Sequence, residues 1–465
     1  MVSDLCTMSA TGLAKRIRDK DVSSSEVIEA HLERIDNVNG SVNAVTAVLR
    51  EQALAAAEAA DRALAEGTSF GPLHGVPLTV KENIDLAGSA TTQGVLAMAE
   101  AVPPDDAPHI KQLKAAGAIP IARTNLPDFG LRWHTDNALR GATRNPWDPS
   151  LSPGGSSGGE AAALVTGMSP LGMGNDYGGS VRIPSQWCGT TALRPTLGRV
   201  PDASYLAPDD FPITIQLYAV QGPMARHVHD LRLALHSMSG PDARDPWWTP
   251  VPLEGPPPNN PARVAMVVDP AGEGVDSEVA AGVQRAADAL RDAGYMVEDA
   301  EPPLIAEARD TWASQVVAEI KIALYDVIRE NGSDGARRFL EGMFDVVPDP
   351  GYAGYVMSFA RRATIARQWS QFFERYDLVL GPVATMQPFP ADYDLEHQRE
   401  VLDAMRLVVT VNLLGLPAVA VPAGPADGRP QGVQVIGNRY REDVCLDAAE
   451  AIEARLGRPG PIDPL

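Results

Sequence analysis

The sequence alternates short apolar, β-branched runs with longer segments of helical periodicity, and this alternation restricts the folds open to it. The run "GVPLTVKENID", residues 75–85, is typical of a buried strand, while "HIKQLKAAGAIPIARTN", residues 109–125, predicts a helix, a turn and a second strand. Later, "ARVAMVVD" predicts a strand, and residues 275–295 follow it with a helical pattern. Strands interleaved with helices indicate an α/β fold with a largely parallel sheet.

Pattern also divides the chain into consecutive parts. Ser23 and Glu26 have the spacing of a helical capping box, and an alanine-rich helix is expected at about residues 51–66. A length of 465 residues allows roughly three domains, but large α/β enzymes often keep one sheet. The predicted parts are an N-terminal helical segment 8–66, a core 70–240 that holds two glycine-rich loops, a proline-rich connection 240–262 and a C-terminal α/β part 263–465.

Charge and cysteine content restrict the partners and the compartment. The formal net charge is −21, with acidic residues spread along the chain, which disfavours binding to nucleic acid or to an anionic membrane. The three cysteines, Cys6, Cys188 and Cys445, are too few and too far apart for a disulfide framework or a zinc site. No stretch resembles a signal peptide or a membrane span. We therefore expect a soluble cytoplasmic protein, monomeric or homodimeric, with no metal and no membrane or nucleic-acid partner.

The first glycine-rich loop, "SPGGSSGGEAAAL" at residues 152–164, admits several interpretations. A linker would be followed by polar residues, whereas this loop runs into an apolar helix start. A phosphate-binding loop would end in Gly-Lys-Ser/Thr, and no lysine lies between Lys114 and Lys321. A nucleophile elbow fits Gly154–Gly158 but requires a strand directly before it, and "NPWDPSLSP" stands there. A site that needs backbone amides close to a substrate remains.

A second glycine-rich loop, "GMGNDYGGSVRIPS" at residues 172–185, follows after about 20 residues. Consecutive glycines let neighbouring backbone N–H groups converge on an anion, which is what an oxyanion requires during acyl transfer. Ser180 follows Gly178 and Gly179 directly and is a candidate nucleophile. A tight turn capped by serine is the structural alternative for this loop taken alone.

A serine nucleophile requires a base, and lysine is the available residue type. Arginine is never deprotonated in proteins, and only six of the 39 basic residues are lysines. Five of the six fall in segments with a helical pattern; Lys81 instead ends the apolar run "GVPLTV". Burial there would lower its pKa enough to make it a base. The alternative for Lys81 is a lysine at a strand end that reaches solvent.

Taken together, these segments resemble the amidase signature family. The lysine segment "GVPLTVKENIDLAG" and the paired loops "TRNPWDPSLSPGGSSGGEAAALVTG" and "GNDYGGSVRIPSQWCGTTALRPT" match its defining signature. Further segments, such as "VQGPMAR" and "LLGLPAVAVPAG", extend the resemblance over residues 10–455. The resemblance implies an α/β fold in a single large domain, with a mixed, mostly parallel sheet core covered by helices on both faces.

The resemblance also implies a role for each matched position. Lys81 would be the catalytic base, Ser156 the bridging serine next to a cis peptide bond, and Ser180 the nucleophile. The oxyanion hole would consist of the backbone amides of Tyr177, Gly178 and Gly179 together with that of Ser180. Supporting residues around the site would be Ser157, Asp176 and Arg182, the last two having a surface ion pair as their structural alternative.

Two segments depart from the common family pattern and are candidates for walls of the substrate pocket. Trp133 and His134 lie where many relatives have small residues, and packing is the alternative role for both. The segment 201–220 is also unusual, and its Tyr205, Phe211 and Tyr218 are candidates to line an apolar or aryl site.

The implied activity is hydrolysis of the C–N bond of small aliphatic, aryl or acyl amides through a serine acyl-enzyme, with extension to anilides, carbamates (urethanes) or esters. No cofactor is required, and Cys188 is interpreted as a small buried thiol rather than a rival nucleophile. The alternative is a glutaminase-type subunit, similar to glutamyl-tRNA amidotransferase A, of a transamidating complex. A scaffold that has lost catalysis is disfavoured because all three candidate catalytic residues are present.

Overall fold

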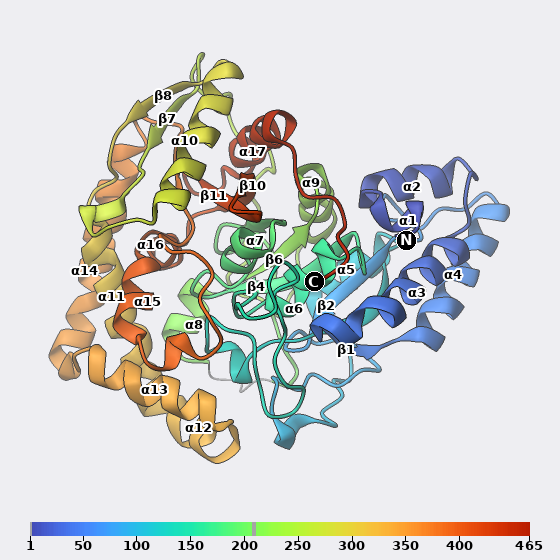
Figure 1. Cartoon of the computed structure of the whole chain (residues 1–465), viewed down its shortest axis with the longest axis horizontal. Coiled ribbons are helices and arrows are strands. Elements are labelled where there is room, and N and C mark those ends of the chain that lie inside the picture. The colour runs from blue at the N-terminus through green and yellow to red at the C-terminus, as the bar shows by residue number, and fades with distance from the viewer. Residues whose placement is uncertain (1, 207–210) are drawn as a thin grey trace.

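A computed structural model describes residues 2–206 and 211–465, and one eleven-stranded sheet runs through it (Figure 1). The strands lie in the order β1-β3-β2-β4-β6-β5-β10-β11-β9-β7-β8. Their bounds are β1 Val45–Val48, β2 Pro77–Lys81, β3 Ile119–Thr124, β4 Leu171–Asp176, β5 Thr191–Arg194, β6 Val220–Ala225, β7 Arg263–Met266, β8 Met296–Asp299, β9 Leu378–Pro382, β10 Ala418–Ala426 and β11 Arg429–Gly437.

Helices flank this sheet. In Figure 1 the N-terminal helices α1–α4 lie at one end of the molecule and α11–α14 at the other. The bounds are α1 Asp4–Thr7, α2 Ala10–Arg18, α3 Ser24–Val42, α4 Arg50–Ala65, α5 Pro108–Ala115, α6 Gly158–Val165, α7 Arg182–Cys188, α8 Ile213–Tyr218, α9 Val228–Met238, α10 Ser277–Asp292, α11 Ile305–Glu319, α12 Tyr325–Asn331, α13 Asp334–Val346, α14 Gly351–Phe372, α15 Gln398–Ala404, α16 Arg406–Leu414 and α17 Glu442–Leu456. Shorter helical turns are η1 Leu96–Met98, η2 Asp128–Gly130, η3 Pro270–Gly272, η4 Ile320–Leu324 and η5 Tyr393–Leu395.

The pairing of the strands confirms a mixed sheet but not the expected predominance of parallel pairs. Among the described strands, six pairings are antiparallel and four are parallel. Alternation of strands and helices suggested parallel crossovers, yet β5 and β6 are separated by α8 and still pair antiparallel. In addition, β10 and β11 form a hairpin. Helical connections alone therefore do not determine strand direction.

The sheet is buried on both faces because alternate strand residues enter two different cores. On β10, Ala418 and Ala420 belong to the core formed with α7, α11, α14 and α16. Their neighbours Val419 and Val421 belong to the core formed with α9, α10 and α17. The predicted cover of helices on both faces is thus confirmed.

The two helices predicted for the N-terminal segment are confirmed. Ser23 caps α3 in a complete capping box with Glu26, and α4 corresponds to the alanine-rich helix. Between the two helices the chain forms β1, which the helical interpretation of residues 23–66 missed. Between α9 and β7 the proline-rich stretch contains no regular element.

The parallel direction of β2 and β4 brings Lys81 and the second glycine-rich loop to one edge of the sheet. β2 and β4 are parallel neighbours, with Leu78 opposite Leu171 and Val80 opposite Met173. Lys81 is the last residue of β2, and Asp176 is the last of β4. Because the carboxyl ends of parallel strands meet at the same edge, where α/β proteins place their ligands, this edge is the candidate site.

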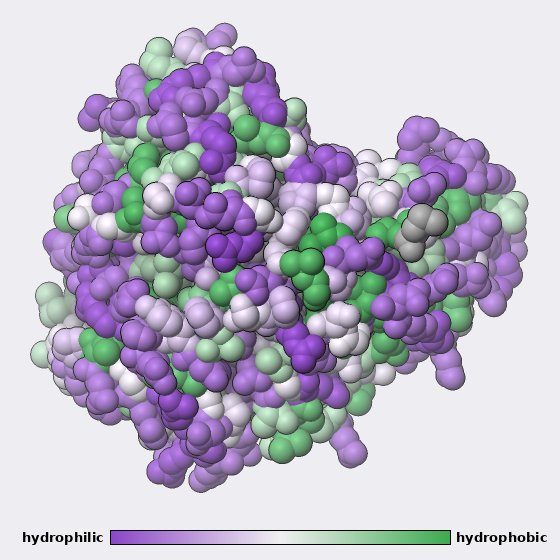
Figure 2. Space-filling model, viewed as in Figure 1, coloured by the Kyte–Doolittle hydropathy of each residue, from purple (hydrophilic) through white to green (hydrophobic). Residues whose placement is uncertain are grey.

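The outer surface is polar over most of the face drawn in Figure 2, with apolar residues in small scattered patches. This distribution agrees with 60 acidic residues against 39 basic ones. In the part of the chain that the structure describes, no helix has the length and apolar character needed to cross a membrane.

Candidate active site

Lys81 and Ser156 come together at the carboxyl edge of the sheet. The lysine is fully buried, and its Nζ lies 2.7 Å from Ser156 Oγ. The same Nζ donates to Asn175 Oδ1 at 2.8 Å, and Asn175 in turn donates to Asn83 Oδ1 at 3.0 Å. The solvent-reaching alternative for Lys81 is therefore wrong, and its amine is held in place by two neutral oxygen atoms.

Burial controls the ionisation of this lysine. Desolvation lowers the pKa of Lys81 to about 7, against a usual value of about 10.4, and the carboxylates of Asp176 and Glu160 oppose this shift only in part. Glu160 is itself buried, and desolvation raises its pKa to about 7 even though Thr79 and Thr124 donate hydroxyl hydrogen bonds to it. A substantial fraction of Lys81 is thus neutral near pH 7 and able to accept a proton.

The first glycine-rich loop brings Ser156 to the lysine by close backbone packing. The Gly155–Ser156 peptide bond is cis, as the family resemblance implied for this position. A Cβ at Gly155 would lie 2.5 Å from Arg132 O, and one at Gly154 would lie 2.7 Å from Pro184 Cα. Larger residues therefore cannot occupy these positions without moving neighbouring backbone, and the linker interpretation is wrong.

Ser180 lies between β4 and α7, beside the Ser156 loop. Its carbonyl accepts a hydrogen bond of 3.1 Å from Ser157 N, which joins the two serine-bearing loops, and the residue is 7% exposed. The Ser157 hydroxyl is buried and has no hydrogen-bonding partner among the described residues. Ser157 therefore contacts the candidate nucleophile through its backbone.

Asp176 organises the loop that carries Ser180. Its carboxylate accepts hydrogen bonds from Gly179 N at 2.9 Å and from Asn412 Nδ2 at 2.8 Å, and it pairs with Arg182 Nε at 2.9 Å. The side chains of Asp176 and Arg182 are both 0% exposed, so the surface ion pair alternative is wrong. Arg182 and its neighbours hold the pKa of the Asp176 carboxyl far below its usual value.

The backbone amides of the second loop are not equivalent. Gly179 N already donates to Asp176 Oδ1, which makes it less available than its neighbours for the predicted place in the oxyanion hole. Within the described residues, the N–H groups of Tyr177, Gly178 and Ser180 donate to no protein acceptor. Gly179 has a φ of +95°, which suits glycine and lets its flanking amides point in a common direction. Tyr177, Gly178 and Ser180 are therefore the candidate oxyanion donors.

The predicted pocket residues separate into two groups. Trp133 and His134 are buried and contact the site loops: Trp133 Nε1 donates to Gly178 O at 3.0 Å, and His134 Nδ1 lies 3.0 Å from Ser152 Oγ. Burial lowers the pKa of His134 to about 4, so the ring is neutral. Both side chains act in loop packing in this structure.

The residues predicted from segment 201–220 lie in three different environments. Tyr205 is 43% exposed, and the guanidinium carbon of Arg244 lies 5.1 Å from the centre of the Tyr205 ring. The backbone N–H of Tyr205 donates to Asp85. Phe211 is also exposed, and Tyr218 is buried with its hydroxyl donating to Gln315. Residues 207–210 of this segment lie outside the described residues.

Several site residues escaped the sequence analysis. Asn175 and Asn83 extend the polar chain from Lys81, and a Cβ at Gly130 would lie 3.3 Å from Ser156 Oγ. A Cβ at Gly178 would lie 2.9 Å from the Trp312 ring. The position of Asn175 within the second loop motif was an available signal, whereas Trp312 is distant in sequence and gave none.

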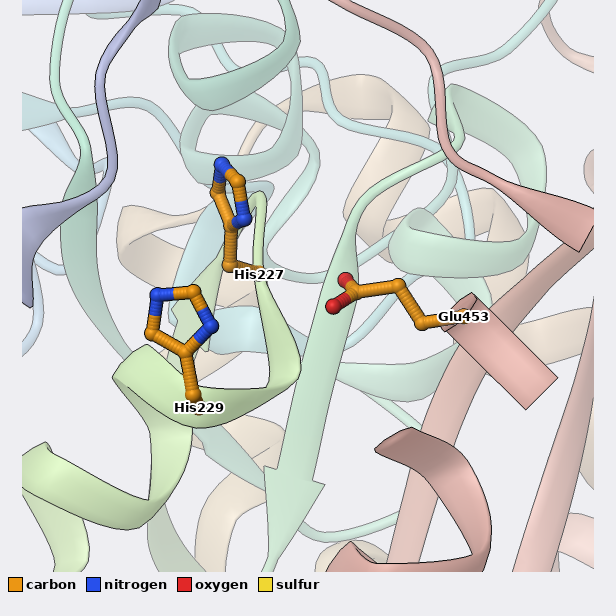
Figure 3. A group of neighbouring side chains, drawn as sticks. All are labelled: His227, His229 and Glu453. Atoms are coloured by element: carbon orange, nitrogen blue, oxygen red, sulfur yellow. The ribbon is translucent and has the colours of Figure 1, made fainter. Parts of the chain in front are cut away.

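Cys188 and a histidine pair are two further groups of potentially reactive side chains in the described residues. Cys188 is fully buried and burial raises the pKa of its thiol, in agreement with its interpretation as an inert group. His227, His229 and Glu453 form the group drawn in Figure 3, with one ligand atom from each lying within 4.8 Å of the others. Arg458 Nε donates to His227 Nε2, and Val228 N donates to Glu453 Oε1, so both side chains have protein partners.

Loss of the buried ion pair gives a measurable prediction. Arg182→Met should lower the free energy of unfolding by about 3–5 kcal/mol, because the Asp176 carboxylate would remain buried without its cation. Urea unfolding monitored by fluorescence measures the change. Arg291→Met, which removes an exposed pair with Asp288, is the matched control and should change stability by no more than about 0.5 kcal/mol. Equal effects of the two substitutions on stability would contradict the assignment of Asp176 and Arg182 as a buried, stabilising ion pair.

Comparison with known proteins identifies the family of this chain. A family model described as Amidase matches residues 26–446. The chain belongs to the amidase family. It is 42% identical to an indoleacetamide hydrolase of Bradyrhizobium diazoefficiens, over 97% of this chain and 86% of that protein. It is 31% identical to the A subunit of the glutamyl-tRNA(Gln) amidotransferase of Moorella thermoacetica, over 97% of each.

Solved structures of this amidase family match the whole fold. A bacterial aryl acylamidase of the amidase signature enzymes aligns with a TM-score of 0.85 at 26% identity and covers 97% of each chain. A 6-aminohexanoate cyclic dimer hydrolase aligns with a TM-score of 0.84 at 27% identity and covers 98% of each. The protein is an amidase that hydrolyses amide C–N bonds, and the amidotransferase-like alternative fits less well because identity to that class is lower.

Proposed function

We propose that Lys81, Ser156 and Ser180 form the proton relay and nucleophile of this amidase. The observation that supports this most strongly is a fully buried Lys81 whose Nζ lies 2.7 Å from Ser156 Oγ. Neutral Lys81 accepts the proton of the Ser156 hydroxyl, and Ser156 accepts the proton of Ser180 as Ser180 Oγ attacks the amide carbon. The new negative charge on the carbonyl oxygen is stabilised by the N–H groups of Gly178, Ser180 and Tyr177.

Collapse of this intermediate requires the relay to run in the opposite direction. Ser156 returns a proton to the departing nitrogen while it recovers one from Lys81, the C–N bond breaks, and the amine or ammonia leaves. A water molecule then attacks the acyl carbon and gives its proton to the same relay. The carboxylic acid leaves, and Ser180 recovers its hydroxyl hydrogen. Protons and atoms balance without a metal or an organic cofactor.

We propose a primary amide of an arylacetic acid as the substrate class. The 42% identity to an indoleacetamide hydrolase supports this choice, as does the 40% identity to a second one from Bradyrhizobium japonicum. Tyr177 and Trp312, whose ring centres are 6.1 Å apart, place aromatic surface beside the loop of Ser180. We also expect the enzyme to act alone, as a monomer or homodimer in the cytoplasm, and without nucleic acid, which its net charge of −21 repels.

Hydrolysis by the purified chain alone tests this function. The panel contains indoleacetamide, phenylacetamide, an aliphatic primary amide, an acyl anilide, a carbamate, an ester and glutamine. We expect the highest kcat/KM on the two arylacetamides. Preference for glutamine, or activity that appears only with a partner protein, would overturn the proposal.

A further inference from the structure

One peptide of the second glycine-rich loop is held at both ends. The carbonyl of Gly178 accepts a hydrogen bond from Trp133 Nε1 at 3.0 Å, and the N–H of Gly179 donates to Asp176 Oδ1 at 2.9 Å. Because a trans peptide directs its C=O and N–H to opposite sides, these two contacts fix the orientation of the peptide plane. The amides on either side of that plane, those of Gly178 and Ser180, are two of the three proposed oxyanion donors.

Glycine makes this fixation necessary. Two successive glycines leave the backbone freer than any other pair of residues, and Gly179 has a positive φ of +95°. The space around Gly178 does not allow a larger residue, since a Cβ there would lie 2.9 Å from the Trp312 ring. The loop therefore depends on hydrogen bonds from outside to hold a single conformation.

Trp133 is itself held rigidly and touches both loops. Its side chain is 6% exposed and packs edge-on against Phe339 of α13, with ring centres 5.8 Å apart. Its backbone lies against Gly155, where an added Cβ would be 2.9 Å from Trp133 Cα. The preceding residue, Arg132, is anchored by an ion pair with Asp394 at 2.7 Å. One residue thus connects the position of Ser156 with that of the oxyanion donors.

We propose that Trp133 is a positioning residue whose indole N–H holds the Gly178–Gly179 peptide, so that the oxyanion hole is formed before the substrate arrives. This inference rests on the proposed function. It replaces the role in the substrate pocket that the sequence suggested for Trp133. Removal of the N–H would leave the Gly178 carbonyl without its donor and the peptide held only through the Gly179 N–H, which would weaken binding of the transition state more than binding of the substrate.

Trp133→Phe keeps an aromatic ring and removes the donor, and Trp369→Phe is the matched control. Trp369 is equally buried and its Nε1 donates to Pro303 O at 2.8 Å, a contact on α14 that is not part of the site. For Trp133→Phe on phenylacetamide we expect kcat to fall about 10–100-fold with KM within about threefold of wild type. The inhibition constant of phenylacetaldehyde, a transition-state mimic, should rise by the same factor. Trp369→Phe should leave both constants within about twofold.

A second variant distinguishes the loss of the indole N–H from a folding defect. Replacement of Trp133 by 3-benzothienylalanine keeps the shape of the side chain and substitutes sulfur for the N–H, so it should show the same loss of kcat at an unchanged Tm. A loss of kcat below threefold in both variants, an equal loss in Trp369→Phe, or an effect on KM alone would overturn the positioning role. The reaction of Ser180 with a fluorophosphonate distinguishes failure of the Trp133 inference from failure of the proposed function. A wild-type enzyme that neither reacts with the fluorophosphonate nor hydrolyses amides would contradict the proposed function itself.

Discussion

Ser180→Ala should reduce amide hydrolysis by roughly 10⁴-fold or more while the protein remains folded, because no other hydroxyl can attack the carbonyl carbon in its place. The side chain is small and makes no hydrogen bond to another described residue, so its removal leaves no buried partner unsatisfied. Initial rates on phenylacetamide and mass spectrometry of the fluorophosphonate adduct measure the effect. The adduct should appear on wild type and be absent from the variant.

Cys188→Ala provides the matched control for this substitution. It removes a buried thiol near the first glycine-rich loop, whose Sγ lies 3.4 Å from Pro153 O. Activity within about threefold of wild type is expected, because burial raises the pKa of Cys188 and keeps it protonated. Substantial activity in Ser180→Ala, or its loss in Cys188→Ala, would contradict the assignment of the nucleophile.

Lys81→Met should lower kcat/KM by about 10²–10⁴-fold and remove a characteristic pH dependence. Only the neutral amine is a base, and the pKa of Lys81 is lowered to about 7. The active fraction of wild type therefore increases as pH rises through 7, and activity falls as pH drops below it. Measurement of kcat/KM between pH 5 and 9 should give an ascending limb with its midpoint near pH 7.

Glu160 also titrates near this pH and must be distinguished from the lysine. Glu160→Gln keeps an acceptor oxygen for one of the Thr79 and Thr124 hydroxyls, turns an amide N–H towards the other, and removes the negative charge that raises the pKa of Lys81. The ascending limb should persist in this variant and move to lower pH. A profile that is flat in wild type, or a limb that vanishes in Glu160→Gln, would contradict Lys81 as the base.

The candidate reacting residues could be located from the sequence more readily than their surroundings, because they lie in motifs that resemble those of a known family. Lys81, Ser156 and Ser180 lie in local motifs whose glycines and strand pattern determine where each side chain points. Sheet direction was predicted less well, since β5 and β6 pair antiparallel across a connection of more than 20 residues that no local pattern describes. Local motifs identify reacting groups, whereas strand pairing depends on contacts between distant segments.

The pocket residues illustrate the same limit. Trp133 departs from the family pattern, but its role can be assigned only from the contact of its indole with Gly178 O. Tyr205 and Phe211 are aromatic side chains that suit an aryl substrate, and the structure places both at exposed positions. Composition indicates which side chains could line a pocket, but the packing of helices around the sheet determines which ones do.

The anchoring of Asp176 also has a consequence for the order of events during protein synthesis. Asn412 donates to its carboxylate, and Arg182, its ion-pair partner, donates to Gln434 at 2.8 Å. When Ser180 leaves the ribosome, these two anchors have yet to be translated, and at roughly 5–20 residues per second they follow some 10–50 s later. A nascent or prematurely terminated chain therefore carries every proposed reacting residue without the framework that orients them. Hydrolytic competence is in this way delayed until translation is almost complete.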